Sequence, residues 1–203
     1  WSDPELLDAV TVSSIAAWNG ANWASVGDGV QMIDGGTTNP GRVTALAYGS
    51  NTLYAGGYFN RAGGKNVNYI AQFAGGAWSA LGSGVKDEDF STESPINDMV
   101  FAGNTLYVGG KFVAAGGKPI DLLAAWDGGA WNEIADGGIP NASGFDRVYS
   151  LAVAPAGLVV GGYFRLAGDK EVHSVTLLSG GEWQAWGQGL GNDWSDMPGN
   201  PLA

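Results

Sequence analysis

The sequence predicts an all-β fold built from tandem four-stranded antiparallel units, and two repeated features carry this prediction. A strand-like stretch with two adjacent glycines occurs three times, as TLYAGGYF, TLYVGGKF and LVVGGYF, at spacings of 53 and 52 residues. A tryptophan also recurs at spacings of 55, 53 and 52 residues, as Trp23, Trp78, Trp131 and Trp183. A period near 50 residues is typical of a repeat architecture and outweighs local signals.

The second unit, residues 42–85, serves as the template for the strands. Residues in Arg42–Tyr48 alternate between apolar and polar, and Thr52–Phe59 carries the glycine pair. Two shorter strands, Tyr69–Ala74 and Trp78–Leu81, follow, and Gly-rich turns separate all four. Alternation with period two, bounded by glycine turns, predicts strands joined into hairpins. The third unit (96–138) and the fourth (147–190) show the same order.

The first unit is only half present in the sequence. Residues 14–30 contain two expected strands, Ser14–Trp18 and Trp23–Val26, which match the last two strands of a full unit. The tail 191–203 ends where the first strand of a further unit would begin. We therefore expect one array of about three and a half units spanning residues 1–203.

The quoted units resemble a known family. The order of an apolar strand with Gly-Gly, an aromatic-centred strand and then Trp resembles the kelch-type repeats of galactose-oxidase-like propellers. The third unit, with LYVGGKFVAAGGK and AAWDGGAWNEI, also resembles a variant of this repeat in bacterial secreted proteins. This resemblance implies that each unit is a blade of a β-propeller-type array. It also implies that the glycines allow close approach of neighbouring blades and that Phe59, Phe112 and Phe164 pack between them.

Propellers usually close with four to eight blades, so three and a half would leave an open array. We expect that the sequence is a segment of a longer chain or that a protein partner completes it. Two copies would not complete each other, because both carry the same half unit.

Composition narrows the function classes. The net charge of −11, with only nine Lys and Arg, disfavours nucleic-acid binding. No apolar run is long enough for a membrane span, and no cysteine is available for a disulfide or a thiolate site. Together with the resemblance, this acidic, cysteine-free composition favours an extracellular or cell-surface location.

The residue inventory offers little catalytic chemistry. His173 is the single histidine, so the copper site of galactose oxidase cannot be assembled. A Ser-His-Asp triad would have to use His173, and no G-x-S-x-G motif before a helix supports one. Nothing in the sequence selects a pair of carboxylates for glycoside hydrolysis, and no catalytic residue is assigned. The recurring tryptophans favour packing between units over sugar stacking, because each occupies the same repeat position.

Candidate binding residues lie in the connections between units, where loop length varies over a constant scaffold. These connections cover residues 28–41, 86–95 and 136–146. The candidate ligand-binding residues are Asp34, Arg42, Asp87, Glu88, Asp89, Asp146 and Arg147. The run Asp87, Glu88 and Asp89 could also hold calcium, although it lacks the spacing of a known calcium loop.

The favoured function is a non-catalytic extracellular or cell-surface module that acts as a rigid scaffold for protein or glycan binding. One alternative is a carbohydrate-active enzyme, a glycosidase or lyase, that uses loop carboxylates. Another is a structural subunit that joins a larger assembly through open blade edges.

Overall fold

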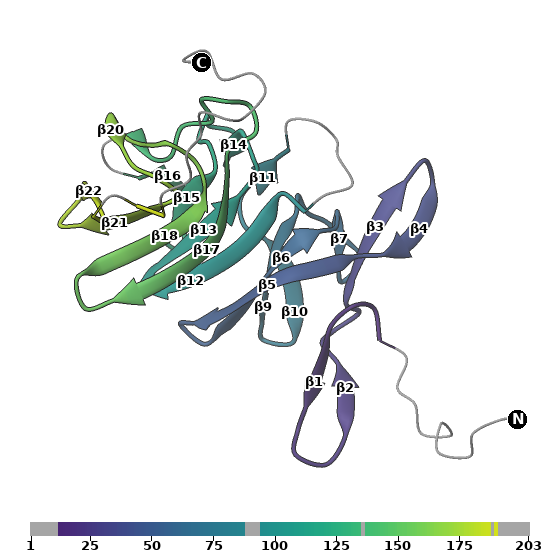
Figure 1. Ribbon diagram of the computed structural model, residues 1–203. Helices are drawn as coiled ribbons and strands as arrows, with labels where there is room; N and C mark the ends of the chain where they lie inside the picture. The colour runs from purple at the N-terminus through teal and green to yellow at the C-terminus, as the bar shows by residue number, and fades with distance from the viewer. Residues whose placement is uncertain (1–11, 88–93, 135–136, 188, 191–203) are drawn as a thin grey trace, which may run out of the picture.

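The computed structural model describes residues 12–87, 94–134, 137–187 and 189–190 (Figure 1). The fold is all-β and contains four four-stranded antiparallel sheets and three two-stranded ones. Within the described ranges no sheet closes on itself. No helix in the same ranges has the length and hydrophobicity to cross a bilayer.

Three of the four-stranded sheets repeat one topology, which confirms the predicted antiparallel sheets. Each sheet begins with a long hairpin and ends with a shorter one, so that strands follow each other in space in chain order. The second unit holds β5 (Arg42–Gly49), β6 (Thr52–Tyr58), β9 (Ile70–Ala74) and β10 (Ala77–Ala80). The third holds β12 (Ile96–Ala102), β13 (Thr105–Gly110), β15 (Leu123–Trp126) and β16 (Trp131–Glu133). The fourth holds β17 (Arg147–Ala154), β18 (Gly157–Tyr163), β21 (Val175–Ser179) and β22 (Glu182–Ala185).

The half unit forms an isolated hairpin of β1 (Ala16–Trp18) and β2 (Trp23–Ser25), as the sequence predicts. Figure 1 shows this hairpin standing at the edge of the molecule. Trp18 and Trp23 face each other across it, with ring centroids 5.4 Å apart. Both are about half exposed, at 52% and 57%, because no unit precedes them among the described residues.

The connection 28–41, expected as a loop, is instead a hairpin of β3 (Val30–Asp34) and β4 (Thr37–Pro40). Gly35 and Gly36 have φ values of 53° and 84°, and such a pair suits a tight two-residue turn. The hairpin pairs with β7 (Arg61–Ala62) and β8 (Lys65–Asn66) in the remaining four-stranded sheet. The remaining short pairs are β11 (Val85–Lys86) with β14 (Ala114–Ala115), and β19 (Leu166–Ala167) with β20 (Lys170–Glu171).

The two glycines of the pair in the third unit are needed for different reasons. A Cβ on Gly109 would lie 2.5 Å from Val148 Cγ1, a side chain of the following unit. A Cβ on Gly110 would instead fall onto the carbonyl oxygen of Pro95, the residue directly before the neighbouring strand β12. The expected close approach of neighbouring units is therefore confirmed for the first glycine, and the second serves the pairing of β12 with β13.

The core lies at the junctions between successive units. Phe59, Phe112 and Phe164 are fully buried. Phe112 belongs to a hydrophobic cluster with Ile70 and Leu81 of the preceding unit, and Phe164 belongs to the equivalent cluster one unit later. This confirms that these phenylalanines pack between units. Burial of such large apolar side chains is the main force that holds one unit to the next.

The recurring tryptophans also join neighbouring units. Trp78 and Trp131 are 2% exposed, and each donates its indole N–H to a carbonyl of the preceding unit. The bonds run from Trp78 Nε1 to Val26 O at 2.8 Å and from Trp131 Nε1 to Leu81 O at 2.9 Å. Packing between units, rather than stacking on a sugar, is therefore the role of these two side chains.

Candidate functional site

The first strands of the three full units, β5, β12 and β17, lie side by side (Figure 1). Each contains a register shift against its partner strand, between Val43 and Ala45 in the first case, and at the two equivalent places in the others. A bulge bends its strand and redirects a side chain. The residues at the bulges are Thr44, Asn97 and Tyr149.

Side chains at two of these bulges bind the following unit. The Thr44 hydroxyl donates to the carbonyl of Ile96 at 2.5 Å. The side-chain amide of Asn97 donates to the carbonyl of Val148 at 2.8 Å. Ile96 and Val148 occupy the same position in successive units, so one type of hydrogen bond is formed twice with different chemical groups. These bonds fix the spacing of β5, β12 and β17.

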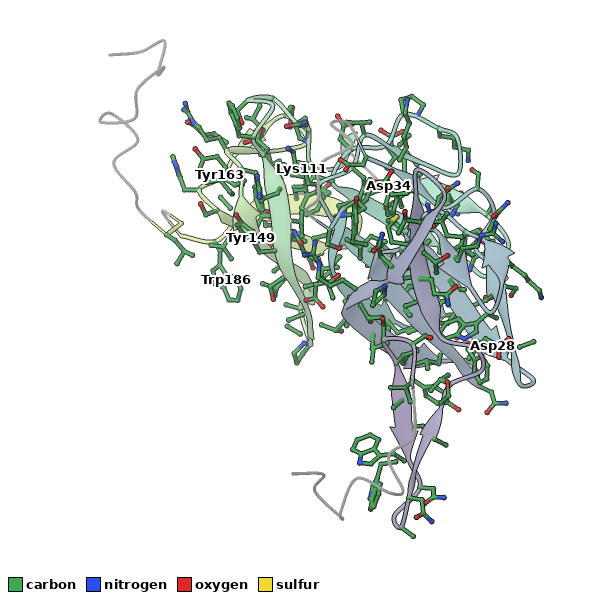
Figure 2. All side chains as sticks on the ribbon, turned by 90° about the vertical axis from the view of Figure 1, so that its right-hand side faces the viewer. Asp28, Asp34, Lys111, Tyr149, Tyr163 and Trp186 are labelled. Carbon is green, nitrogen blue, oxygen red and sulfur yellow. The ribbon has the colours of Figure 1, made fainter. Side chains whose placement is uncertain are left out.

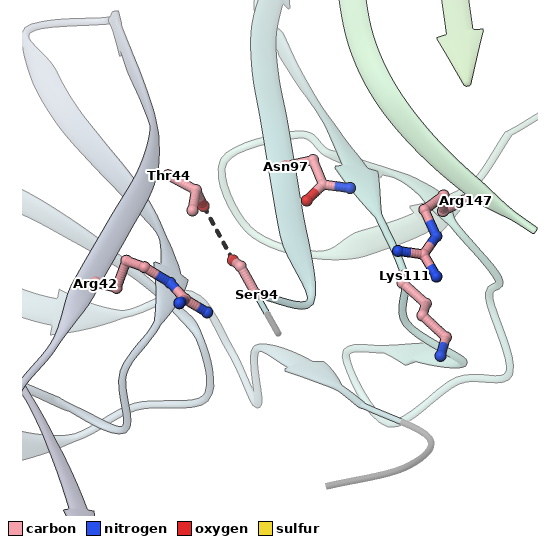
Figure 3. A pocket seen from close by; sticks show the side chains of 6 residues that line it. All are labelled: Arg42, Thr44, Ser94, Asn97, Lys111 and Arg147. Atoms are coloured by element: carbon pink, nitrogen blue, oxygen red, sulfur yellow. Dashed lines mark hydrogen bonds between the residues drawn. The ribbon is translucent and has the colours of Figure 1, made fainter. Parts of the chain in front are cut away.

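A pocket of about 260 Å³ opens beside these bulges (Figure 3). Its lining side chains come from the starts of the three aligned strands and from the segment after β13. They are Arg42, Thr44, Ser94, Asn97, Lys111 and Arg147. The pocket therefore exists only because three units are held in register.

Three of the six lining side chains carry positive charge, in a chain whose net charge is −11. Arg42 and Arg147 occupy equivalent positions at the starts of β5 and β17, and Lys111 directly follows β13. Figure 3 shows Lys111 and Arg147 together on one side of the pocket and Arg42 on the other. Basic side chains from three successive units therefore meet at one place in this acidic chain.

Aromatic rings orient both guanidinium groups. The Arg42 guanidinium carbon lies 5.6 Å from the centroid of the Tyr58 ring, and that of Arg147 lies 5.8 Å from the Tyr149 ring. A guanidinium held over a ring is attracted to the negative face of that ring, which restricts the side chain to one orientation. Tyr58 in turn stacks on Tyr69, with centroids 6.1 Å apart.

The two hydroxyl groups of the pocket donate their protons within the protein, and Asn97 uses one of its two amide N–H groups in the same way. Ser94 Oγ donates to the Ile96 carbonyl at 2.6 Å, which also accepts from Thr44. The two hydroxyl oxygens lie 3.0 Å apart. Asn97 gives a side-chain N–H to Val148, and Figure 3 shows its oxygen turned toward Ser94. These three groups thus present oxygen lone pairs between the cations.

The structure brings Arg42 and Arg147, two of the predicted ligand-binding residues, into one pocket. The sequence reasoning missed Lys111, Thr44, Ser94 and Asn97. A comparison of the units could have singled out Lys111, because the other two full units carry a tyrosine at this position, Tyr58 and Tyr163.

Two predicted acids lie elsewhere. Asp34 is exposed at the end of β3, and Figure 2 shows it near the tip of the β3–β4 hairpin. Asp146 is 4% exposed, and its carboxylate accepts from Ser143 N at 2.9 Å and Ser143 Oγ at 2.7 Å. Neither acid lines the pocket, and the Asp146 carboxylate holds the turn that leads into β17.

The acidic run after β11 is described only at its first residue, since Glu88 and Asp89 lie outside the described ranges. Asp87 is buried, at 5% exposure. Burial raises the pKa of the Tyr69 hydroxyl, and the charges of Asp87 and Tyr58 raise it further. Among residues that the structure describes, no group of three or more acidic or histidine side chains could hold a metal ion. The calcium site at Asp87, Glu88 and Asp89 therefore stays a prediction.

A second feature is a face of β17 and β18 that carries Ser150, Ala152 and Gly161, here called the uncovered face. Ser150 and Ala152 are exposed. Ala45, the residue of β5 that is equivalent to Ser150, is only 6% exposed. A Cβ on Gly161 would meet only Ser150 O, at 3.9 Å. No described residue therefore occupies the place that Val148 and Leu151 fill beside Gly109.

One lysine of each full unit also has a structural role that the sequence reasoning missed. Lys65, Lys118 and Lys170 donate from Nζ to the carbonyls of Trp78, Trp131 and Trp183, at 2.9, 2.8 and 2.7 Å. Their recurrence at spacings of 53 and 52 residues was the available signal. These lysines stabilise each unit and do not contribute to the pocket.

The chain matches no protein-family model, and no match was found among curated proteins.

Proposed function

We propose that this chain is a non-catalytic binding scaffold, a β-propeller-type array of about three and a half blades, which binds a protein partner that supplies a further unit of the same repeat. The observation that carries the proposal is the uncovered face of the fourth unit. The equivalent faces of the second and third units are each covered by the strand that begins the next unit.

The two existing junctions define what such a partner must provide. At the first, a Cβ on Gly56 would lie 2.7 Å from Ile96 Cγ2 and 3.1 Å from Met99 Sδ. At the second, Gly109 is covered by Val148 and Leu151. Both junctions thus place a β-branched residue and, three positions later, a longer aliphatic residue over the glycine. A partner strand with this pattern would fit over Gly161 with the same packing.

The opposite end of the array supports the same interpretation. Leu46 is 54% exposed, whereas its equivalents Met99 and Leu151 are 4% and 7% exposed. Tyr48, next along this face, is 68% exposed. Large side chains exposed in a row are typical of an interaction surface. A partner that carries a glycine-bearing strand would cover them.

The positions of the described carboxylates favour a binding function over a hydrolytic one. Among the described residues that line the pocket none is a carboxylate, and Asp146 already binds Ser143. We therefore place the carbohydrate-active enzyme second. The extracellular or cell-surface location remains part of the proposal, supported by the acidic, cysteine-free composition and by the resemblance to kelch-type repeats of secreted proteins.

The test is a chain that is extended by one duplicate unit. Residues 147–190 are attached again after residue 203, so that a second copy of Val148 and Leu151 can reach Gly161. Amide hydrogen exchange is then measured in β17 and β18 with and without the duplicate. We expect slower exchange in β18 and an increased unfolding temperature, because apolar side chains become buried.

A variant shows whether the duplicate unit packs on the uncovered face or is only attached to the chain. Gly161→Leu in the original copy fills the space that the duplicate would occupy, and it should abolish the protection. The matched control Ala156→Leu lies at the exposed turn between β17 and β18 and should leave it unchanged. Exchange that is unaffected by the duplicate, or protection that survives Gly161→Leu, would contradict the proposal.

A further inference from the structure

We infer that the outer edge of β1 is a docking site for a β-hairpin of the protein partner, and that the second strand of this hairpin carries the Gly-Gly pair of the repeat. The docking site rests on the proposed binding function but lies at the opposite end of the array from the uncovered face. Three observations support it: the pairing of the equivalent strands, the backbone at Ser14, and the exposed side chains of β5.

The third strand of each full unit lies between two neighbours. β15, for example, pairs with β13 on one edge and with β16 on the other. Among the described strands β1 pairs with β2 alone, so its other edge has no described neighbour (Figure 1). The sequences also agree, since residues 15–18 read IAAW and β15 reads LAAW. A strand of the β13 type is therefore the neighbour that fits this edge, and extended segments bind to open sheet edges in this way.

The backbone at Ser14 has the conformation that receives such a strand. Its φ is 68°, and the equivalent residues Tyr69, Leu122 and Ser174 have φ values of 62°, 55° and 65°. Each of these three accepts at its carbonyl from the second glycine of its unit, and donates its N–H to the phenylalanine two positions further on. The described residues make neither bond to Ser14. The Ser14 hydroxyl donates to the Gly41 carbonyl at 2.6 Å, which holds this uncommon conformation ready for both bonds.

The exposed side chains of β5 fit the same strand. Leu46 and Tyr48 occupy the positions of Met99 and Phe101 in the next unit. A Cβ added at the first glycine of β6 would lie 3.1 Å from Met99 Sδ. The Phe101 ring meets the Tyr54 ring of β6 edge on, with centroids 5.4 Å apart. A single strand of the β6 type would therefore cover Leu46 and Tyr48 while it pairs with β1.

These contacts define the sequence of the partner strand. In every full unit a leucine of the second strand stands opposite the large apolar residue of the third strand. These leucines are Leu53, Leu106 and Leu158. We therefore expect a leucine opposite Trp18, an aromatic residue next to meet Tyr48, one further apolar residue, and then the glycine pair. Trp18 is 52% exposed, whereas its equivalent Trp126 in a complete unit is 6% exposed, so docking would bury a large apolar surface.

The test attaches a copy of residues 96–112, the long hairpin of the third unit with its buried phenylalanine, before Trp1 of the full chain. Residues 1–13 then connect the added strand to Ser14, and the equivalent connection in the second unit, residues 60–68, is shorter. Amide hydrogen exchange is measured in β1 with and without the added hairpin. We expect exchange in β1 to slow by about tenfold or more, because backbone hydrogen bonds of ordinary strength form along this edge.

Matched substitutions test the expected register. Leu106→Asp in the added copy places a charge opposite Trp18 and should abolish the protection. Asn104→Asp in the added copy introduces the same charge at the exposed turn of the hairpin and should not. In the receiving chain, Leu46→Ser should reduce the protection. Val153→Ser, at a similarly exposed apolar residue of β17, should leave it unchanged.

Three results would overturn the inference. The first is exchange in β1 of the original chain that is already as slow as in β15, which would show that the edge is covered. The second is exchange in β1 that the added hairpin does not change. The third is an equal effect of Leu106→Asp and Asn104→Asp. Circular dichroism of each extended chain shows whether the array keeps its fold.

The outcome is distinguishable from a failure of the proposed function. The duplicate unit attached after residue 203 is monitored in β17 and β18, whereas the added hairpin is monitored in β1. Protection of β18 by the duplicate, without protection of β1 by the hairpin, would support the proposed function and reject this docking site. Protection of β1 alone would support the docking site and contradict the role given to the uncovered face.

Discussion

Asn97 donates a side-chain hydrogen bond of 2.8 Å to the carbonyl of Val148, one unit further along the chain. Thr44 makes the equivalent bond to Ile96 from the preceding unit. The chain therefore repeats a contact between units while changing the residue that makes it. The third residue in this series, Tyr149, is 54% exposed and has no following unit among the described residues.

This series predicts unequal effects of substitution at equivalent positions. Asn97→Ala should lower the free energy of unfolding by about 1–2 kcal/mol, because the half-buried bond to Val148 is lost. Tyr149→Ala should lower the free energy of unfolding by less, since no described unit accepts a hydrogen bond from Tyr149. Chemical denaturation of the two variants checks the difference, and equal losses would contradict the role assigned to Asn97.

The buried tryptophans give a second matched comparison. Trp131→Phe should destabilise by about 1–3 kcal/mol, because the buried Leu81 carbonyl loses its donor. Trp183 is also fully buried, but its Nε1 has no hydrogen-bond partner in the described part of the chain. Trp183→Phe should therefore be tolerated better. Thermal unfolding of both variants is the measurement, and the reverse order would contradict this account.

The repeated lysines predict a loss of stability that depends on the hydrogen bond from the amine rather than on the removal of a positive charge. Lys118→Met should lower the unfolding temperature, because the Trp131 carbonyl loses the Nζ donor while the aliphatic stem is kept. Lys86→Met, at an exposed residue of β11, serves as the control. A similar decrease in both variants would show that lost charge, rather than the bond to Trp131, is responsible.

Tyr69 predicts a dependence of stability on alkaline pH. Its pKa in the folded chain lies above the ordinary value of 10.0, because burial and the charge of Asp87 disfavour the phenolate. The resulting stabilisation is fully present below the unfolded pKa and is lost as pH rises through the folded pKa. Tyr69→Phe should reduce the decline in unfolding temperature above pH 10. An unchanged decline would contradict this contribution.

The strands could be predicted because alternation and glycine turns recur in every unit, and the repeated Phe and Trp positions predicted the junctions. The pocket could not be predicted as a whole. It depends on bulges at Thr44 and Asn97, and a register shift leaves no mark in alternation. The hairpin of β3 and β4 was missed because Asn39 and Pro40, which are rare in strands, obscure its second strand.

One repeated backbone feature was also invisible in the sequence. Ser14, Tyr69, Leu122 and Ser174 all adopt positive φ, between 55° and 68°, at the same place before the third strand of a unit. The carbonyls of the last three accept from the second glycine of the pair in their own unit, at 2.9 Å each. No common residue type marks this position, because the geometry of the sheet imposes it.

The central claim is that Gly56 and Gly109 each receive a side chain from the next unit, and that no described residue fills the equivalent place beside Gly161. The most direct test is thermal unfolding of Gly109→Val and Gly161→Val in the full chain. Gly109→Val should destabilise by about 1–3 kcal/mol or more, because Val148 leaves no space for its side chain. Gly161→Val should be neutral or stabilising, because nothing obstructs it and valine suits a strand better than glycine. Comparable destabilisation in both variants would contradict the claim.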